Sequence, residues 1–595
     1  MDKLHKYNMG IIGNCSYLAY IDTSAAIKWA CMPRFDSSFV FGSLLDENKG
    51  GHFSVSPSKK AIENRQYYLE NTNILCTEFT TEDGRYRVID FAPRFYQYDR
   101  YYRPLMICRK IERIAGRPSI KVTCSPVGDY GKTKPEILIG SNHIRYLGIG
   151  DQVRLTTNIP LNTIVNEQSF ILSEDKYLAF TYGEPLEAPL IETMETFYTK
   201  TRSYWMNWIK STSIPNFYQK EIIRSALVLK LHQYEDTGGI IASGTTSLPE
   251  ADKSTRNWDY RYCWMRDAYY TLMAFNSIGH FEELEKYFLY IENIVLNEES
   301  RIQPLYSIIG EKNLTENIID LDGYLGNTPV RIGNDAYTHI QNDVYGQLLV
   351  SILPIFTDKR LNTNIKYHSK KIVELLLSKI ESKINEPDAG LWEFRNRKQY
   401  HTYTYLFHWA GCKAAQKIAH AFNDSDLMKK AEMLANLASD YIERSYSIEK
   451  MAYTQAVDVS HLDASGLNLV LMNYLDPNSE RAISHIEAHK KELMTDQGLF
   501  YRYRHEDDFG KPDTTFFVCS FWFAEALAST NQIDSAIEYF ENLLKYSNHL
   551  GLFSEDVDIN GGQWGNFPQT YSHVGLINTA FRIAKKLDYP IFYSK

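Results

Sequence analysis

Several features that mark common classes of protein are missing from this sequence. Its eight cysteines are scattered and form no Cys-x-x-Cys pair, which argues against a disulfide framework and against a zinc site. No apolar run is long enough to span a bilayer, and the first residues lack the basic and apolar regions of a secretory signal. With reduced thiols and no targeting segment, the protein is expected to be cytoplasmic.

Charge and cofactor signatures are equally sparse. The net charge is −9 and no long block of Lys and Arg is present, so neither nucleic acid nor a membrane surface is an expected partner. No Gly-x-Gly-x-x-Gly pattern follows a predicted strand and no P-loop is present, so no nucleotide cofactor is predicted. The histidines of the C-terminal part lack the spacing of metal ligands, so no metal is predicted either: His401, His408, His461 and His573. The sequence predicts no particular oligomeric state.

What the sequence does have is an apolar fraction of 44% and 43 tyrosines in 595 residues. The apolar fraction is typical of a globular protein with an ample core. Tyrosine combines a flat ring with a hydroxyl group, which suits a carbohydrate-binding surface, although half-buried packing explains many of the copies equally well.

Two patterns of hydrophobic residues divide the chain. Residues 1–189 contain short alternating or β-branched runs between turn residues and predict an antiparallel β-sandwich. Residues 190–215 predict a linker helix, and residues 216–595 follow the helical period almost throughout. The predicted helices lie near 217–233, 265–278, 281–297, 333–353, 366–382, 401–422, 424–443, 462–473, 479–491, 514–529, 532–547 and 569–587.

The connections that follow the odd-numbered helices are long, and most of the others are short. An antiparallel arrangement places these long loops at one end of a bundle: 234–264, 298–332, 383–400, 444–461, 492–513 and 548–568. Helical hairpins closed into a ring in this way would form an (α/α)6 barrel. Because functional residues tend to lie on loops held by a rigid scaffold, we expect the functional site at that end.

The first long loop leads into a dense aromatic and charged stretch, residues 257–267. Its rings and its final pair of charges are Trp258, Tyr260, Tyr262, Trp264, Arg266 and Asp267. An arginine beside a carboxylate can fix the hydroxyl groups of a sugar while aromatic rings stack on its apolar face. A buried ion pair in an aromatic core is the alternative interpretation, and composition alone favours neither.

Two other long loops each carry a glutamate among aromatic residues, Glu393 in the third and Glu555 in the sixth. Glycosidic hydrolysis requires a pair of carboxyl groups, because one acid protonates the leaving oxygen while one base activates water. Leu391 and Trp392 are expected to desolvate Glu393 and raise its pKa, as a general acid needs. The polar neighbours of Glu555 suit an ionised base. Taken singly, each glutamate is better explained as a solvated surface residue. The shared face and the aromatic surroundings make a catalytic pair an equally good interpretation.

Ordered blocks along nearly the whole chain resemble glycoside hydrolase family 15, which contains glucoamylases, glucodextranases and some microbial trehalases. The blocks are residues 10–14, 27–37, 245–250, 256–267, 329–334, 390–395, 551–555 and 566–577. The resemblance implies a β-sandwich followed by an (α/α)6 barrel, and hydrolysis with inversion at the anomeric carbon. One departure is Asp556, where fungal members often have Gln, and we expect it to affect the outer subsites.

The resemblance also implies roles for single residues. Glu393 matches the general acid and Glu555 the general base, and Arg266 with Asp267 matches the pair that holds the terminal glucose. Further matches line the innermost subsite or its neighbour: Trp264, Trp392, Arg331 and Arg502.

From these observations we expect an inverting, exo-acting hydrolase of the glucoamylase type, which releases β-glucose from the non-reducing ends of α-glucans or malto-oligosaccharides. The expected partner is therefore an α-glucoside or oligosaccharide substrate. An α,α-trehalase that uses the same acid and base is the alternative. A non-catalytic glucan-binding protein on the same barrel is a more remote one.

Overall fold

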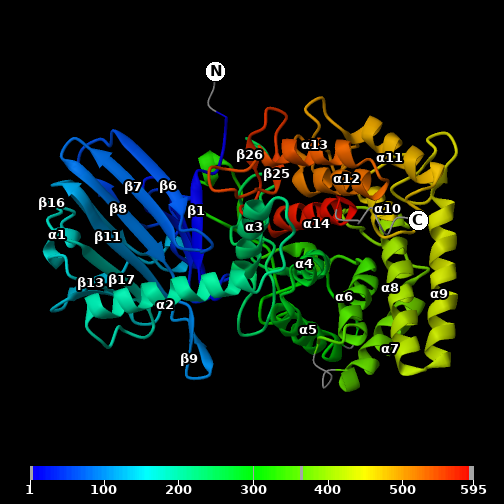
Figure 1. Cartoon of the computed structure of the whole chain (residues 1–595), viewed down its shortest axis with the longest axis horizontal. Helices are drawn as coiled ribbons and strands as arrows, with labels where there is room; N and C mark the ends of the chain where they lie inside the picture. The colour runs from blue at the N-terminus through cyan, green and yellow to red at the C-terminus, as the bar shows by residue number, and fades with distance from the viewer. Residues whose placement is uncertain (1–3, 299, 362–365, 588–595) are drawn as a thin grey trace.

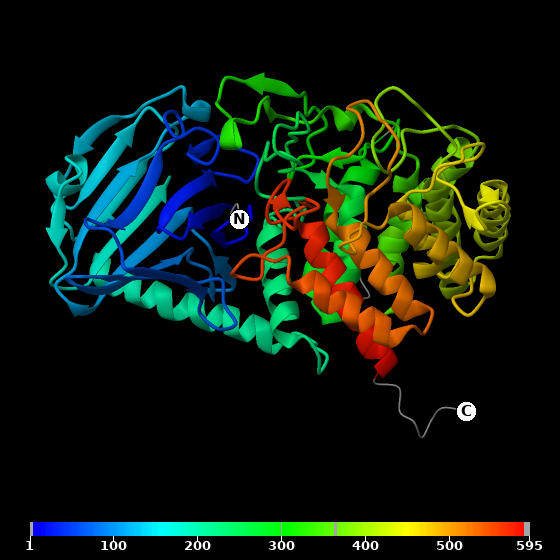
Figure 2. The same ribbon diagram turned by 90° about the horizontal axis from the view of Figure 1, so that it is seen from above.

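The computed structural model describes residues 4–298, 300–361 and 366–587. It has two bodies that lie side by side, one built of strands and one of helices (Figures 1 and 2). A long helix, α2 (Leu190–Lys210), runs along the strand-rich body towards the helical body. The ends of the predicted domains, residues 1–3 and 588–595, lie outside the described residues, and the predicted domain boundaries stay predictions.

The strand-rich body is a sandwich of two antiparallel sheets. The first has seven strands in the order β1 (Met9–Gly13), β2 (Leu18–Asp22), β3 (Ala26–Cys31), β5 (His52–Pro57), β12 (Ser119–Ser125) and β16 (Ser169–Ile171), with β4 (Phe39–Phe41) paired to β3. The second has eight, in the order β13 (Glu136–Ile139), β14 (His143–Leu147), β15 (Val153–Thr157), β17 (Lys176–Tyr182), β11 (Met106–Gly116), β8 (Gly84–Phe91), β7 (Leu75–Thr81) and β6 (Glu63–Tyr68). The hairpin β9 (Phe95–Gln97) and β10 (Arg100–Tyr102) and the short helix α1 (Leu161–Val165) lie beside these sheets.

Side chains of the first sheet alternate between two cores. Ile12 belongs to the core inside the sandwich, whereas its neighbour Ile11 and the paired Tyr20 belong to the core of the helical body. Successive side chains of a strand point to opposite faces, which explains why β1 is buried at every position. On the far side of the sandwich, Met194 of α2 packs against the outer face of the second sheet, in one cluster with Cys108 of β11.

The helical body contains twelve α-helices in the part of the chain that the structure describes. They are α3 (Gln219–His232), α4 (Met265–Ile278), α5 (Phe281–Leu296), α6 (Asp343–Thr357), α7 (Lys366–Lys383), α8 (Thr402–Phe422), α9 (Ser425–Arg444), α10 (Asn468–Leu471), α11 (Glu480–Leu493), α12 (Phe517–Ser529), α13 (Ile533–Leu544) and α14 (Thr570–Leu587). Two predicted segments were too long. The helix predicted to start at 333 starts at Asp343, because Gly333 has φ of 78° and His339 is extended. Segment 462–473 is a 3-10 turn (Ala464–Leu467) followed by α10.

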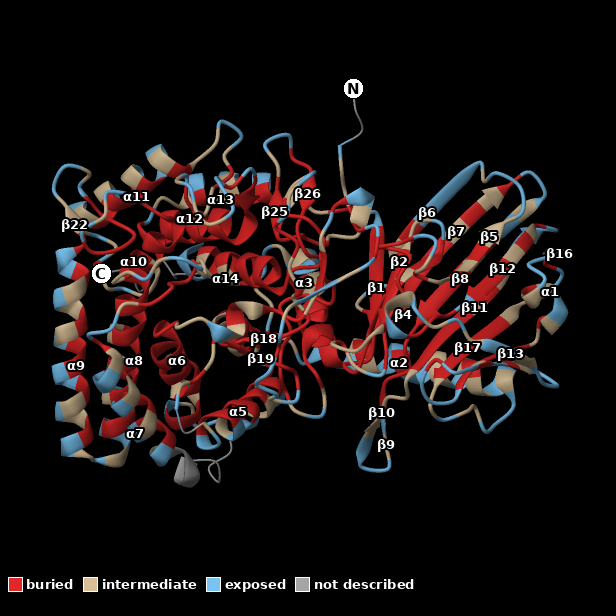
Figure 3. Ribbon diagram, turned by 180° about the vertical axis from the view of Figure 1, so that it is seen from behind, coloured by how far each residue is buried: buried red, intermediate tan, exposed pale blue. Residues whose placement is uncertain are grey.

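The even-numbered helices form an inner ring, in which neighbours contact one another and α14 closes back onto α4. Between α8 and α10 the contact runs through the 3-10 turn. The inner helix α12 is buried at all of its 13 residues, whereas the outer helix α9 buries one apolar stripe of 6 among its 20 (Figure 3). The body is therefore the (α/α)6 barrel that the loop pattern predicts.

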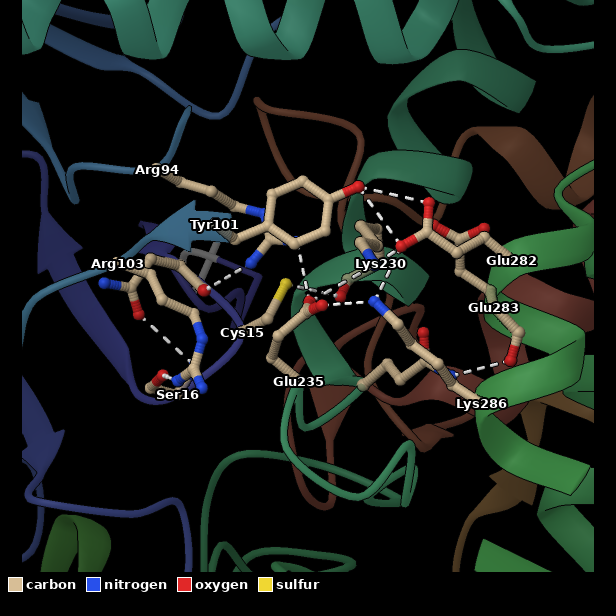
Figure 4. Close-up of polar contacts among 12 residues, drawn as sticks. Cys15, Ser16, Arg94, Tyr101, Arg103, Lys230, Glu235, Glu282, Glu283 and Lys286 are labelled. Atoms are coloured by element: carbon tan, nitrogen blue, oxygen red, sulfur yellow. Dashed lines mark hydrogen bonds and ion pairs between the residues drawn. The ribbon is translucent and has the colours of Figure 1, made fainter. Parts of the chain in front are cut away.

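A buried network of charges joins the sandwich to the barrel (Figure 4). Arg94 of the sandwich, whose side chain is fully buried, donates from Nη2 to Oε2 of Glu235 at 2.6 Å. Lys230 of α3 and Lys286 of α5 pair with the same carboxylate. Burial alone would raise the pKa of Glu235, but these three cations lower it to about 2. Matched charges thus fix the two bodies to each other.

None of the helices in the described residues is sufficiently long and apolar to cross a membrane.

Candidate active site

Two adjoining pockets lie where the long loops meet at one end of the barrel. The inner pocket is lined by Ala242, Tyr260, Trp264, Arg266, Asp267, Leu391, Trp392, Glu393, Arg502, Phe516, Glu555, Gln569 and Tyr571. The outer pocket is lined by Glu250, Arg256, Trp258, Tyr260, Asn334, Ala336, His339, Trp392, Glu393, Phe394, Arg395, Arg502, Tyr503, Asp507, Asp508 and Phe509. The two pockets share Tyr260, Trp392, Glu393 and Arg502.

Short paired strands fix the loops that line these pockets. The pairs are β18 (Cys263–Trp264) with β19 (Leu305–Tyr306), β20 (Asn317–Ile319) with β21 (Val330–Ile332), and β22 (Tyr446–Ser447) with β23 (Ala452–Tyr453). A three-stranded unit, β24 (Thr515–Phe516), β25 (Asp556–Val557) and β26 (Gln563–Trp564), joins the fifth loop to the sixth. The loop residues are therefore held by backbone hydrogen bonds as well as by packing.

Arg266 and Asp267 lie in the first turn of α4 and face the inner pocket. Nη1 of Arg266 donates to the backbone oxygen of Leu391 at 3.1 Å and to Oε1 of Gln341 at 3.3 Å. Its Nε lies 3.4 Å from Oδ1 of Asp267, yet neither of these buried atoms has a hydrogen-bond partner among the described residues. The two atoms are each other's ion-pair partner in the wall of the inner pocket.

Glu393 lies at the end of a tight turn in the third loop. Gly390 and Glu393 have φ values of 69° and 61°, and the backbone N–H of Glu393 donates to the oxygen of Gly390 at 3.1 Å. A non-glycine residue in this conformation costs about 1–3 kcal/mol, and such residues cluster at functional sites. Oε1 of Glu393 accepts hydrogen bonds from Nε1 of Trp264 at 2.8 Å and from Nε2 of Gln341 at 3.2 Å. The carboxyl group is therefore fixed between the two pockets.

Glu555 lies immediately before β25 in the sixth loop and is buried. Its Oε1 accepts a hydrogen bond from the hydroxyl of Tyr260 at 2.6 Å, and its Oε2 accepts one from the backbone N–H of Asn566 at 3.2 Å. Gly565, with φ of 73°, passes so close that a Cβ there would lie 2.6 Å from Cβ of Glu555. The hydroxyl of Tyr7, from the N-terminal segment, donates to the oxygen of Gly565 at 3.0 Å.

The electrostatic settings predicted for the two glutamates were wrong. The side chain of Glu393 is 23% exposed in spite of its apolar neighbours, whereas Glu555 is only 1% exposed. The polar residues near Glu555 in sequence do not solvate it. Asp558, for example, accepts a hydrogen bond from Nε1 of Trp564 at 2.8 Å instead. The prediction failed because it considered only the neighbours of Glu555 in the sequence, whereas side chains from other loops surround Glu555 in the structure.

Glu555 belongs to a cluster of three buried carboxylates, which we call the carboxylate cluster: Glu250, Glu555 and Asp556. Burial and the charge of Glu250 raise the pKa of Glu555 well above the usual range, while Tyr260 and Arg502 oppose this shift. Asp556 was expected to affect the outer subsites, and it lies instead in this cluster beside the base. Within the described residues the cluster is the one group spaced to hold a cation, but Arg502 already pairs with Glu250 at 2.6 Å.

Trp264, Trp392 and Arg502, which the sequence suggested as binding residues, all line the inner pocket. Nε1 of Trp392 donates to Oδ2 of Asp463 at 2.7 Å, so a buried residue beyond the fourth loop fixes this ring. Nε of Arg502 is buried without a hydrogen-bond partner among the described residues.

Arg331 differs from the prediction, because it lines neither pocket. Its Nη1 donates to the backbone oxygens of Thr255 and Asn257, and its Nε pairs with Glu316 at 3.1 Å. The guanidinium group lies 4.7 Å from the ring centre of Trp258, a residue of the outer pocket. Arg331 therefore supports the wall of the outer pocket from behind.

The sequence-based site omitted several pocket residues. Tyr260 lies in the aromatic stretch that the sequence emphasised, but nothing in the sequence indicated that its hydroxyl meets Glu555. Glu250 ends one of the blocks that carry the family resemblance, and no chemistry was assigned to it. Gln569 and Tyr571 at the start of α14 line the inner pocket and carried no signal of their own.

The histidines singled out in the sequence line neither pocket. Burial lowers the pKa of His401 and of His408 to about 3. The ring of His461 packs against that of His505 with centroids 4.8 Å apart. Nε2 of His573 accepts a hydrogen bond from the backbone N–H of Phe553 at 3.2 Å, so this residue supports the sixth loop.

An (α/α)6 barrel with two glutamates and an arginine–aspartate pair at the loop end defines a class of enzyme, the glycoside hydrolases of this barrel type. The model of glycosyl hydrolases family 15 matches residues 216–581, and that of a trehalase-like N-terminal domain matches residues 5–168. The chain therefore belongs to glycosyl hydrolases family 15, and the protein is a glycoside hydrolase.

Similar proteins cover the chain almost completely. A trehalase from Thermoplasma volcanium is 32% identical over 97% of this chain and 93% of its own length. A trehalase from Mycobacterium tuberculosis is 29% identical over 95% of this chain and 87% of its own length. The crystal structure of a bacterial glucoamylase in complex with acarbose superposes with a TM-score of 0.68 over 98% of this chain and 96% of that one. At 14% sequence identity, this last likeness concerns the fold alone.

Proposed function

We propose that this enzyme is an α,α-trehalase that hydrolyses its substrate with inversion. The observation that carries the proposal is the extent of the similarity to trehalases, which runs through the sandwich and the barrel alike. This similarity favours the trehalase activity over the glucoamylase activity that the sequence first suggested.

The shape of the outer pocket supports a short substrate. The backbone N–H of Arg395, in the third loop, donates to Oδ2 of Asp508, in the fifth, at 2.5 Å. The guanidinium of Arg395 lies 5.0 Å from the ring of Trp258 and 5.2 Å from that of Phe509. Three loops thus meet on the rim of the outer pocket. A pocket bounded in this way suits one further sugar ring, whereas a long glucan needs an open groove.

The roles of the two glutamates follow from the two pockets. Glucose in the inner pocket and the leaving sugar in the outer pocket would place the glycosidic bond beside Glu393, which lines both. Glu393 donates a proton to the leaving oxygen as the bond to the anomeric carbon breaks. Glu555 accepts a proton from the water that attacks the opposite face of that carbon. Arg266, Asp267 and the rings of the inner pocket hold the glucose that is released.

A substrate panel tests the proposed specificity. We expect kcat/KM to be highest for α,α-trehalose among trehalose, maltose, maltotriose, isomaltose and soluble starch, measured by release of glucose. Turnover of maltose and starch without turnover of trehalose would overturn the proposal in favour of a glucoamylase.

Replacement of either carboxyl group tests the proposed chemistry. Glu393→Gln and Glu555→Gln should each lower kcat by about two to four orders of magnitude, because each removes one proton transfer. The exposed Glu386→Gln in the third loop is the matched control, since its side chain is 47% exposed and pairs with Lys383 at the surface. Near-wild-type turnover by either variant would refute its role. With trehalose the leaving sugar keeps its α configuration, so inversion should give equal amounts of α- and β-glucose as the first products in proton NMR spectra. α-Glucose alone would refute inversion.

A further inference from the structure

Glu250 has no part in the proton transfers above, yet it is among the most enclosed groups at the site. It is 3% exposed. Its Oε1 accepts a hydrogen bond from Nε1 of Trp258 at 3.0 Å, and its Oε2 accepts one from Nη2 of Arg502 at 2.6 Å. Nε of Arg256 lies 4.0 Å from the same Oε2. Arg502 lines both pockets, so Glu250 fixes a side chain at the junction where the bond to be cut would lie.

Glu250 is also a neighbour of the proposed base. One oxygen each of Glu250, Glu555 and Asp556 lies within 4.8 Å of the other two, and Oδ2 of Asp556 is buried without a partner among the described residues. Carboxylates so close in a buried site resist simultaneous ionisation, and they titrate as a group. The charge of Glu250 therefore bears on the ionisation of Glu555.

Other elements also face this group. Tyr260 and the backbone N–H of Asn566 donate to Glu555. Further titratable or charged groups that act on Glu555 or on Asp556 are Arg502, Arg256, Tyr7 and Cys519. The cations are thus shared among three carboxylates, and Arg502 makes its short ion pair with Glu250 and not with Glu555.

We propose that Glu250 is a positioning residue for the hydrolysis, which anchors Arg502 between the two pockets and strengthens Glu555 as a base through its negative charge. A stronger base takes the proton of the attacking water more readily, provided that its pKa stays near the working pH. The proposal rests on the role of Glu555 as the base, and it does not depend on which sugar occupies the outer pocket.

The pH profile of Glu250→Gln tests this role. The acidic limb of kcat/KM reports the ionisation of the base in the free enzyme. Removing a negative neighbour makes Glu555 easier to ionise, so the midpoint of this limb should move to lower pH by about one unit. At the optimum, kcat should fall roughly tenfold, because the base is weaker and Arg502 is loosened. Asp556→Asn should move the midpoint in the same direction.

Two further variants separate charge from structure. Glu250→Asp keeps the charge but shortens the side chain, so kcat/KM should fall without a shift of the midpoint. Glu316→Gln removes a carboxylate that anchors Arg331 and Arg395 and lies outside the cluster, so its midpoint should equal that of the wild type. An unmoved midpoint in Glu250→Gln would overturn the proposal, whatever the midpoint of Asp556→Asn. So would a shift of equal size in Glu316→Gln.

The profiles are measured with trehalose or, if the wild type does not hydrolyse it, with maltose. Failure of the trehalase proposal therefore changes only the substrate used, and the response of the midpoint still decides the role of Glu250. If Glu250→Gln does not fold, as judged by circular dichroism, Glu250→Asp tests the anchoring of Arg502, and Asp556→Asn tests whether a carboxylate next to Glu555 sets the midpoint. Wild-type kcat/KM in the first or an unmoved midpoint in the second would then overturn the proposal.

Discussion

Glu393 and Gly565 place the two proposed catalytic groups through their own backbone conformations. Both have φ in the left-handed region, at 61° and 73°. Glu393 adopts this conformation at a cost in free energy, so the rest of the third loop must hold it there. Gly565 adopts it freely and leaves room for the side chain of Glu555. At the scale of single residues, the site is thus set by backbone geometry as well as by functional groups.

Gly565→Ala should lower kcat about a hundredfold with a small change in secondary structure. The added Cβ would lie 2.6 Å from both Cβ and Oε2 of Glu555, so the carboxylate has to move, and a displacement of about 1 Å is enough for a loss of this size. Steady-state kinetics and circular dichroism measure the two effects.

Gly551→Ala, in the same loop, is the matched control. Its φ is also left-handed, at 76°, but the nearest atom to an added Cβ is 3.6 Å away on Arg224. If both variants lose the same activity, strain in the loop and not the clash with Glu555 accounts for the loss.

At the scale of elements, the helices of the barrel hold their connecting loops together at one end, where the loops contact one another. The first, second, third, fifth and sixth loops each contribute residues to the pockets, while the connection between α9 and α10 supports them from behind. The 3-10 turn before α10 is an example, because Asp463 at its start holds the ring of Trp392. Burial raises the pKa of Asp463 to about 6, and the hydrogen bonds from Ser465 and Trp392 oppose this shift.

Asp463→Ala should lower kcat/KM about tenfold, chiefly through a higher KM. The change leaves the indole N–H of Trp392 without its acceptor, at a cost of about 1–3 kcal/mol, and frees a ring that lines both pockets. Ser465→Ala is the control, because its hydroxyl donates to the other oxygen of Asp463 at 2.6 Å and does not touch Trp392. Equal losses in the two variants would contradict a specific role for the bond to Trp392.

At the scale of the whole molecule, the sandwich is part of the support of the site. The N-terminal segment reaches the sixth loop through the bond from Tyr7 to Gly565 and through His5, whose ring stacks on Trp564 at 4.1 Å between centroids. The charge network of Figure 4 joins the same two bodies through Arg94 and Glu235. The base loop therefore depends on contacts that the barrel alone does not supply.

Glu235→Gln should lower the free energy of unfolding by about 3–5 kcal/mol, because it leaves Arg94 buried without its counter-charge, whereas Lys230 keeps Glu283 at 3.0 Å. Glu282→Gln is the control. Glu282 pairs with Lys286 at 2.7 Å, but its side chain is 52% exposed, so the loss should stay below about 1 kcal/mol. Both free energies of unfolding are measured by urea denaturation, with tryptophan fluorescence as the signal. An equal loss of unfolding free energy in the two variants would show that burial of the network does not add to the stability of the protein.

Much of the architecture could be predicted from the sequence because it depends on short-range patterns. Periods of two and of 3.6 residues separated sandwich from barrel, and alternating loop lengths indicated the ring. The predicted helices failed where local backbone features, such as Gly333, interrupt the helical period. Arg331 shows the corresponding limit of prediction at the site. A residue that lies close in sequence to pocket residues can still point its side chain away from the pocket.

By itself, the sequence determined the family and the barrel, because those depend on residue order and on hydrophobic period, and it indicated the two glutamates that we propose as acid and base. The tertiary structure alone decided the electrostatics. Glu555 is buried beside Glu250, which lies 305 positions earlier in the chain, while Glu393 keeps some contact with solvent. The burial of a carboxylate and its distance from other charges depend on which loops come together in the folded chain. No local pattern in the sequence indicates which loops these are.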